Sequence, residues 1–147
     1  MVLSTSVHLP VPVARAWELQ LDHAHWSAHI PHFRVVEPRG PFGLGAQVVI
    51  TQDGLGAVEW TVIRLEGTSF AWESRRPGLR MEGSHRVEPE GDGARLTLGL
   101  VMEGVVGAAL GFLMRRSIEA AVQAEADAFL RWATAPGSAA PASSGRP

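Results

Sequence analysis

The chain has 147 residues, the length of one domain that can bury a single sizeable hydrophobic core. Thirteen Lys and Arg residues oppose fifteen Asp and Glu residues, and the two signs are interleaved along the chain, which argues against a nucleic-acid partner. Because the sequence contains no cysteine, disulfides, thiolate metal ligands and cysteine nucleophiles are excluded together.

No segment of the sequence is typical of export or of membrane insertion. Residues 1–13 lack a basic start, a long apolar run and a small-residue cleavage site, so we expect a cytoplasmic protein. The longest apolar stretch, residues 104–114, is about half of the roughly 20 residues that span a bilayer, so we expect no stable membrane insertion. Residues 135–147 are almost entirely Ala, Pro, Gly and Ser, which predicts a flexible tail after a single domain of residues 1–134.

The first thirty residues predict one strand and two short helices. In residues 3–9 apolar and polar side chains alternate, which is typical of a half-buried strand. Residues 13–20 predict a helix that begins after a proline, and residues 22–30 predict a second helix. Asp22 is placed to cap this second helix, and Pro31 is placed to end it.

Residues 33–103 alternate with a period of two and are divided by glycine-rich turns into about six strands joined mainly by hairpins. The pattern predicts an antiparallel meander in which Met81, Gly83, His85 and Val87 share one face of a strand. The same concave face should collect further side chains from the neighbouring strands: Val58, Trp60, Val62, Phe70, Trp72, Ser74, Leu96, Leu98, Leu100 and Met102.

Residues 105–133 predict one long amphipathic helix. Its apolar stripe would comprise Val106, Leu110, Leu113, Met114, Ala121, Ala124, Ala128, Phe129 and Trp132. The concave face of the sheet is the surface that matches this stripe in length and polarity. The order of elements therefore predicts an α+β helix-grip fold, in which a curved antiparallel sheet of about seven strands surrounds a long C-terminal helix, with two short helices after the first strand.

The chain also resembles the START/pollen-allergen-like helix-grip superfamily (SRPBCC), which includes polyketide cyclases/dehydrases and lipid-transport proteins. The resemblance covers about residues 3–133, and the motifs that carry it are "VPVARAWELQLDHAHW", "FAWES", "HRVEPEGDGARLTL", "MEG" and the final helix. It implies an internal pocket for a ligand between the sheet and the last helix.

The stretch "DHAHWSAHIPH", residues 22–32, contains four histidines and raises the question of a metal site. His25 and His29 are one helical turn apart, but Pro31 interrupts the spacing to His32, and no cysteine or HExxH motif accompanies them. We expect a partly exposed helix anchored by Trp26, without a metal or other cofactor.

His85 is the most informative histidine, because alternation places it on the apolar face of its strand. A neutral imidazole there needs a hydrogen-bond partner, which a serine such as Ser74 or a water could supply. Alternatively, His85 points into a cavity as a ligand donor or as a catalytic acid or base. Glu125 lies at the margin of the helical stripe, where a glutamate usually extends to solvent or pairs with an arginine. A catalytic role for Glu125 is the alternative.

Trp60, Phe70, Trp72 and Met81 could form a solid core or line a cavity. An empty apolar pocket of about 300 Å³ would cost about 7 kcal/mol, which rivals the whole stability of a domain. We therefore expect a cavity to hold ligand or water, or its lining to have collapsed. The candidate ligand-binding residues are Trp60, Phe70, Trp72, Ser74, Met81, His85, Leu98, Leu110 and Met114.

The start of the last helix, residues 104–114, is apolar nearly all round and directs Phe112 away from the stripe. It could form a homodimer contact, provide an apolar portal to the cavity, or be buried under a loop. Three functions follow. The first is binding or carrying a small hydrophobic molecule, lipidic or polycyclic aromatic. The second is a polyketide cyclase/dehydrase-like enzyme that uses His85 as acid or base, and the third is a protein-interaction module. Whether the protein is an enzyme stays open.

Overall fold

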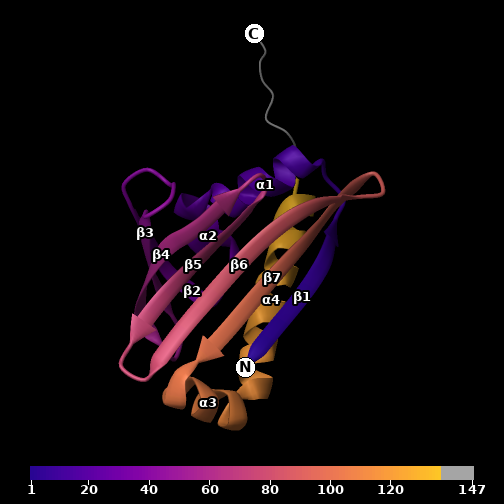
Figure 1. Cartoon of the computed structure of the whole chain (residues 1–147). Helices are drawn as coiled ribbons and strands as arrows, with labels where there is room; N and C mark the ends of the chain where they lie inside the picture. The colour runs from indigo at the N-terminus through magenta and orange to yellow at the C-terminus, as the bar shows by residue number, and fades with distance from the viewer. Residues whose placement is uncertain (137–147) are drawn as a thin grey trace.

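The computed structural model describes residues 1–136, so nearly all of the tail predicted at 135–147 lies outside the described residues. In these described residues seven strands and four helices follow one another (Figure 1). Their bounds are β1 Val2–Leu9, α1 Val13–Leu21, α2 His23–His29, β2 Phe33–Arg39, β3 Gln47–Gln52, β4 Gly56–Glu66, β5 Ser69–Arg76, β6 Leu79–Glu90, β7 Gly93–Glu103, α3 Gly104–Leu113 and α4 Arg115–Thr134.

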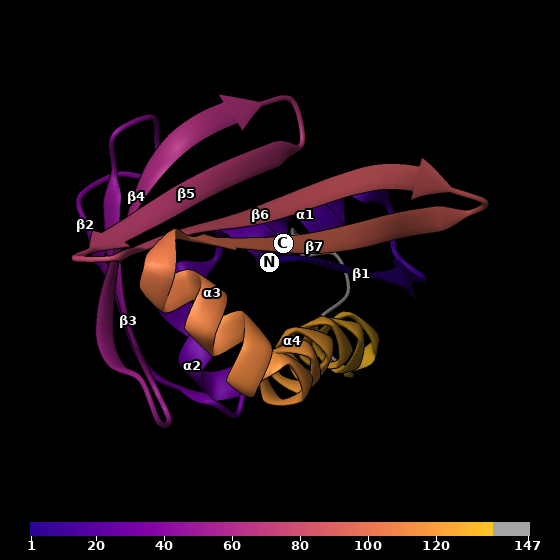
Figure 2. The same ribbon diagram turned by 60° about the horizontal axis from the view of Figure 1, so that its bottom comes forward.

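The strands form one antiparallel sheet in the order β1-β7-β6-β5-β4-β3-β2. Strands β2 to β7 are a meander of neighbours, and β1 pairs with β7 in a register that places Val2 opposite Val101. The sheet curls, and α4 runs along its concave side (Figure 2). This is the predicted α+β helix-grip architecture. Within residues 1–136 no helix is long and apolar enough to cross a membrane.

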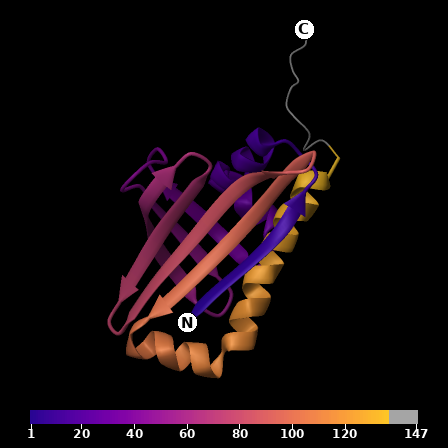
Figure 3. The ribbon, with the colours of Figure 1, turned by 45° about the vertical axis from the view of Figure 1, so that its right-hand side comes forward.

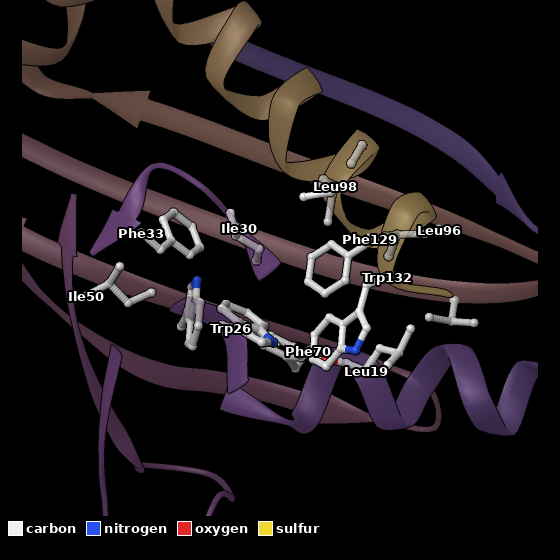
Figure 4. Packing of buried hydrophobic residues seen from close by; sticks show 14 of the residues in the cluster. Leu19, Trp26, Ile30, Phe33, Ile50, Phe70, Leu96, Leu98, Phe129 and Trp132 are labelled. Atoms are coloured by element: carbon white, nitrogen blue, oxygen red, sulfur yellow. Dashed lines mark hydrogen bonds between the residues drawn. The ribbon is translucent and has the colours of Figure 1, made fainter. Parts of the chain in front are cut away.

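The predicted alternation of faces is confirmed on β6, where Met81, Gly83, His85 and Val87 are all buried. The concave face is covered by a cluster of aromatic side chains to which α2 and α4 also contribute. Trp26 of α2 is completely buried, and its indole N–H donates to the Leu19 carbonyl at 3.0 Å. Figure 4 shows Phe129 of α4 directed toward Trp26, and their ring centroids are 5.6 Å apart.

The single helix predicted over residues 105–133 is wrong, because the chain breaks at Met114 into α3 and α4. Helix α3 turns across the end of the sheet instead of continuing the line of α4 (Figure 3). Glycines permit this close packing. A Cβ on Gly107 would lie 3.1 Å from the backbone of Met102, and a Cβ on Gly111 would lie 3.0 Å from the Met1 side chain.

The break also changes which side chains of the predicted stripe are buried. Phe129 and Trp132 are buried in the core, whereas Val106, Leu113 and Met114 are exposed. Asp22 does occupy the N-cap position of α2, as predicted, but its carboxylate does not cap the backbone. Instead it contacts the ring of His25, with 2.7 Å between Asp22 Oδ1 and His25 Nδ1.

Candidate functional site

A cavity of about 310 Å³ lies between the concave face of the sheet and the two C-terminal helices. Strands β2 to β7, α3, α4 and the segments that follow α2 and β3 all contribute to its wall. The inner wall is mainly apolar: Phe33, Ile50, Val58, Trp60, Trp72, Met81, Leu98, Met102 and Val122. The alternation pattern cannot tell whether the side chains on the concave face form a solid core or line a cavity. The structure has a cavity there.

Seven of the candidate ligand-binding residues line this cavity: Trp60, Trp72, Met81, His85, Leu98, Leu110 and Met114. Phe70 and Ser74 do not, although both are buried. Phe70 lies against one face of His85, with 4.7 Å between the ring centroids and 9° between the planes. Strand alternation correctly places Phe70 on the concave face, but it does not reveal that other rings cover it.

His85 lies on β6 with its ring inside the aromatic cluster. Its Nδ1 is 2.8 Å from Oε1 of Gln20 on α1, a residue that is 65 positions away and that strand alternation cannot identify. Since the Gln20 amide nitrogen donates to the Ala16 carbonyl, its oxygen accepts, and His85 Nδ1 carries the hydrogen. The partner of His85 is thus Gln20 and not Ser74, and Nε2 is left as an acceptor.

Glu125 of α4 supplies the second ionisable group of the inner wall. Its Oε2 lies 3.4 Å from His85 Nε2, and its side chain is only 16% exposed. The expectation that Glu125 extends to solvent or pairs with an arginine is therefore wrong. The sequence does carry a signal for this position, because Ile118, Val122, Glu125, Phe129 and Trp132 follow the spacing of one helical face.

Burial decides where the proton of this pair resides. Desolvation raises the pKa of Glu125 from 4.5 to about 8. Desolvation, together with the nearby His23, lowers the pKa of His85 from 6.5 to about 3. At neutral pH both groups are consequently uncharged, with a proton on the Glu125 carboxyl and a free lone pair on His85 Nε2. The cavity thus presents a weak acid and a weak base side by side.

The floor of the cavity is shaped by Gly83, whose missing side chain leaves room for Trp72. A Cβ at position 83 would lie 2.9 Å from Trp72 Nε1. The second indole of the wall belongs to Trp60, with 5.8 Å between the two ring centroids. The two indoles, tilted by 31° to each other, present an aromatic surface to a guest.

Polar side chains of the wall also lie at the ends of elements. His32 precedes β2, Asp53 follows β3, and Arg76 ends β5. Asp53 pairs with Arg34, and Arg76 donates to the Ala57 carbonyl at 2.7 Å. These groups form a polar rim around the apolar interior, as in small-molecule sites generally.

The four clustered histidines have separate surroundings. His23 is buried among Trp26, Phe42 and Trp72, and desolvation lowers its pKa to about 4. His29 stacks on Trp132, with 4.2 Å between ring centroids. Within residues 1–136, no three His, Asp or Glu side chains are grouped so that they could hold a metal ion. The cavity is therefore the candidate functional site.

A curled antiparallel sheet, a helix along its concave side and an apolar cavity between them define a helix-grip domain. The chain belongs to the family described as polyketide cyclase/dehydrase and lipid transport, whose profile matches residues 2–132. The description covers both enzymes and carriers, so membership indicates hydrophobic ligand binding or cyclase-type chemistry without choosing between them. No curated protein matches the chain significantly.

Solved structures similar to this chain share its fold at low sequence identity. TTHA0849 from Thermus thermophilus is 19% identical with a TM-score of 0.74, covering 89% of this chain and 95% of its own. Norcoclaurine synthase from Thalictrum flavum, solved with dopamine and hydroxybenzaldehyde, is 15% identical with a TM-score of 0.70, covering 89% and 84%. The Zhui aromatase/cyclase from Streptomyces sp. R1128 is 18% identical with a TM-score of 0.70, covering 90% and 93%.

Proposed function

We propose that the protein binds a small, flat hydrophobic molecule in the cavity between the sheet and α4. The observation that carries this proposal is the open space of about 310 Å³ with an apolar inner wall. An empty apolar cavity of this size would cost about 7 kcal/mol at roughly 24 cal/mol per Å³. A guest that fills it restores those contacts, so the fold gains stability when the ligand binds.

The shape of the wall favours an aromatic ligand over a flexible chain. Trp60 and Trp72 offer ring surfaces, and Met81 is a flexible side chain that can adapt to the edge of a guest. The volume is at the lower end of the roughly 300–1,000 Å³ of small-molecule sites, which suits a ligand of two or three fused rings. A fused aromatic ligand also loses little conformational entropy on binding.

The test uses naphthalene and 2-naphthol as probes, with calorimetric titration and thermal shift as readouts. The wild-type protein should bind at least one probe and melt at a higher temperature in its presence. Leu98→Trp, which fills the cavity, should weaken binding at least tenfold, whereas Leu44→Trp on an exposed loop should not. If neither probe binds, and native mass spectrometry recovers the protein without a hydrophobic guest, the proposal fails.

A second candidate function is acid–base catalysis on the bound ligand, favoured by the contact between His85 and Glu125. In a dehydration, His85 Nε2 would accept the proton from the carbon next to a carbonyl. Glu125 would donate its proton to the hydroxyl on the next carbon, which leaves as water while the carbon–carbon double bond forms. The proton on His85 would then return to Glu125 through their contact, restoring both neutral groups.

A suitable probe for this chemistry is 3-hydroxy-1-tetralone, which loses one water and tautomerises to the fluorescent 1-naphthol. The wild-type protein should accelerate this reaction. His85→Gln and Glu125→Gln should each abolish the acceleration while retaining affinity for 1-naphthol, which separates catalysis from binding. An unchanged rate in either variant would remove that residue from the mechanism, and no acceleration by the wild type would leave binding alone.

A further inference from the structure

The outer side of α3 carries several large apolar side chains that are exposed to solvent. Val105 is 80% exposed, Phe112 86% and Leu113 74%, and Val106 and Met114 beside them are also exposed. No charged residue occurs from Gly104 to Met114. Large apolar side chains that gather on one exposed helix usually mark a surface that another phase or molecule covers.

The same helix closes one end of the cavity. Leu110 and Met114 line the cavity wall, and Gly107 is buried against Met102. The start of α3 is fixed to the β5–β6 turn, because the backbone N–H of Val106 donates to the Gly78 carbonyl at 2.8 Å. Figure 2 shows α3 lying between the curled sheet and α4. Leu110 of α3 faces the cavity, whereas Val105, Phe112 and Leu113 do not line it and are exposed.

Positive charge follows the apolar segment directly. Arg115 and Arg116 begin α4, and Arg115 pairs with Glu119 at 2.7 Å. Within residues 1–136, Arg116 has no carboxylate within ion-pair distance. The nearest acidic residue before α3, Glu103, already pairs with Arg80 at 3.0 Å. The unpaired charge next to the exposed apolar residues is therefore cationic.

A second copy of the chain fits this surface poorly. A ten-residue helix is about 15 Å long, and a face about 10 Å wide gives on the order of 150 Å². Stable dimers bury about 800 Å² per partner. Binding to a lipid surface does not need so large a buried area. A few apolar side chains in the acyl boundary, with Arg or Lys side chains at the headgroups, are sufficient for reversible binding.

We propose that α3 docks reversibly on the surface of an anionic lipid bilayer, with Val105, Phe112 and Leu113 in the headgroup–acyl boundary and Arg115 and Arg116 at the lipid phosphates. No helix crosses the bilayer in this arrangement. The docked helix would place one end of the cavity at the membrane, where hydrophobic ligands concentrate. The surface is separate from the cavity wall, since Phe112 and Leu113 do not line it.

Flotation with vesicles tests the docking. The wild-type protein should float with phosphatidylcholine vesicles that contain phosphatidylglycerol, and more weakly with pure phosphatidylcholine. Phe112→Ser combined with Leu113→Ser should weaken binding at least tenfold, because two of the side chains that enter the acyl boundary become polar. Arg115→Ser combined with Arg116→Ser should reduce binding to the level seen with pure phosphatidylcholine. Leu44→Ser, which replaces an apolar residue that is 69% exposed in the loop between β2 and β3, should bind like the wild type.

The proposal is overturned if the wild type floats with neither vesicle, or if the Phe112 and Leu113 variant floats like the wild type. It is also overturned if the wild type is a dimer by sedimentation that the same variant converts to monomer, while neither protein binds vesicles. The variant should bind 2-naphthol as the wild type does. Failure of vesicle binding with retained probe binding would reject the docking surface and leave the cavity function intact.

Discussion

His85 Nε2 on the sheet and Glu125 Oε2 on α4 lie 3.4 Å apart across the inner end of the cavity. The contact joins the sheet to α4, and both side chains line the cavity, where a bound molecule would touch them. Since one group is held as a neutral acid and the other as a neutral base, the pair has consequences for stability as well as for chemistry.

In Glu125→Gln the free energy of unfolding should depend less on pH between 6.5 and 8 than it does in the wild type. The folded protein retains the Glu125 proton up to a pKa of about 8, whereas an unfolded glutamate has lost it well below pH 6.5. The folded state therefore binds more protons, and wild-type stability falls as the pH rises from 6.5 to 8, by about 2 kcal/mol. Urea denaturation at several pH values should show this fall in the wild type and a flatter profile in Glu125→Gln.

The exposed Glu37 provides the matched control, because Glu37→Gln makes the same chemical substitution on the edge strand β2, where the side chain is in solvent. This variant should keep the wild-type slope between pH 6.5 and 8. Equal slopes in the wild type and Glu125→Gln would show that the Glu125 carboxyl is ionised in the folded protein, contrary to its buried position.

Gln20 should fix the tautomer of His85. Because Gln20 Oε1 accepts from His85 Nδ1 at 2.8 Å, the ring hydrogen should reside on Nδ1 at neutral pH. Nitrogen-15 NMR of the imidazole should show a protonated Nδ1 and an unprotonated Nε2. In Gln20→Leu the buried Nδ1 loses its partner, and unfolding should become easier by about 1–3 kcal/mol. A protonated Nε2 in the wild type would contradict the arrangement.

Gly83→Ala should reduce the cavity and weaken ligand binding. The added Cβ would meet the Trp72 indole at 2.9 Å, so the ring must shift into the space that a guest occupies. We expect a stability loss of about 1–3 kcal/mol and a weaker calorimetric response to 2-naphthol. Gly43→Ala is the control, because a Cβ there meets no atom within 4 Å and the backbone is not left-handed. Equal binding by both variants would place the ligand elsewhere.

Phe129→Ala should be among the most destabilising single changes in α4. Phe129 is fully buried against Trp26 and Trp132, so truncation leaves a void in the aromatic cluster and should cost about 3–5 kcal/mol. Phe112→Ala removes the same ring from a position that is 86% exposed and should change stability by less than about 0.5 kcal/mol. Urea denaturation of both variants under one condition measures the contrast, and similar losses would contradict the placement of Phe129.

Most of the sheet can be predicted from the sequence, because strand alternation assigns faces residue by residue. Trp60, Trp72, Met81, His85 and Leu98 all lie on the cavity wall as alternation predicts. Alternation does not determine whether facing side chains meet or leave a space. That outcome depends on how strongly the sheet curls, which is a property of the whole fold and not of one strand.

Three features are predicted wrongly or not at all from the sequence, and the first two depend on contacts between distant parts of the chain. The break at Met114 is not predictable from periodicity, since α3 departs from α4 to cover the end of the sheet. The partner of His85 is missed because Gln20 comes from α1, far away in the sequence. Glu125 is predicted at the edge of the stripe, although its spacing to Val122 and Phe129 puts it on the same helical face.

The pairing of β1 with β7 has a consequence for how the protein acquires its ligand. Val2 is aligned with Val101, so the first strand finds its neighbour only after most of the chain has been synthesised. Such non-local pairing is associated with slow folding, and the emerging polypeptide must remain without a finished core until the last strand and helix arrive. The wall of the cavity is therefore assembled only when β7, α3 and α4 are in place, and a partly folded sheet offers a guest molecule no finished binding site.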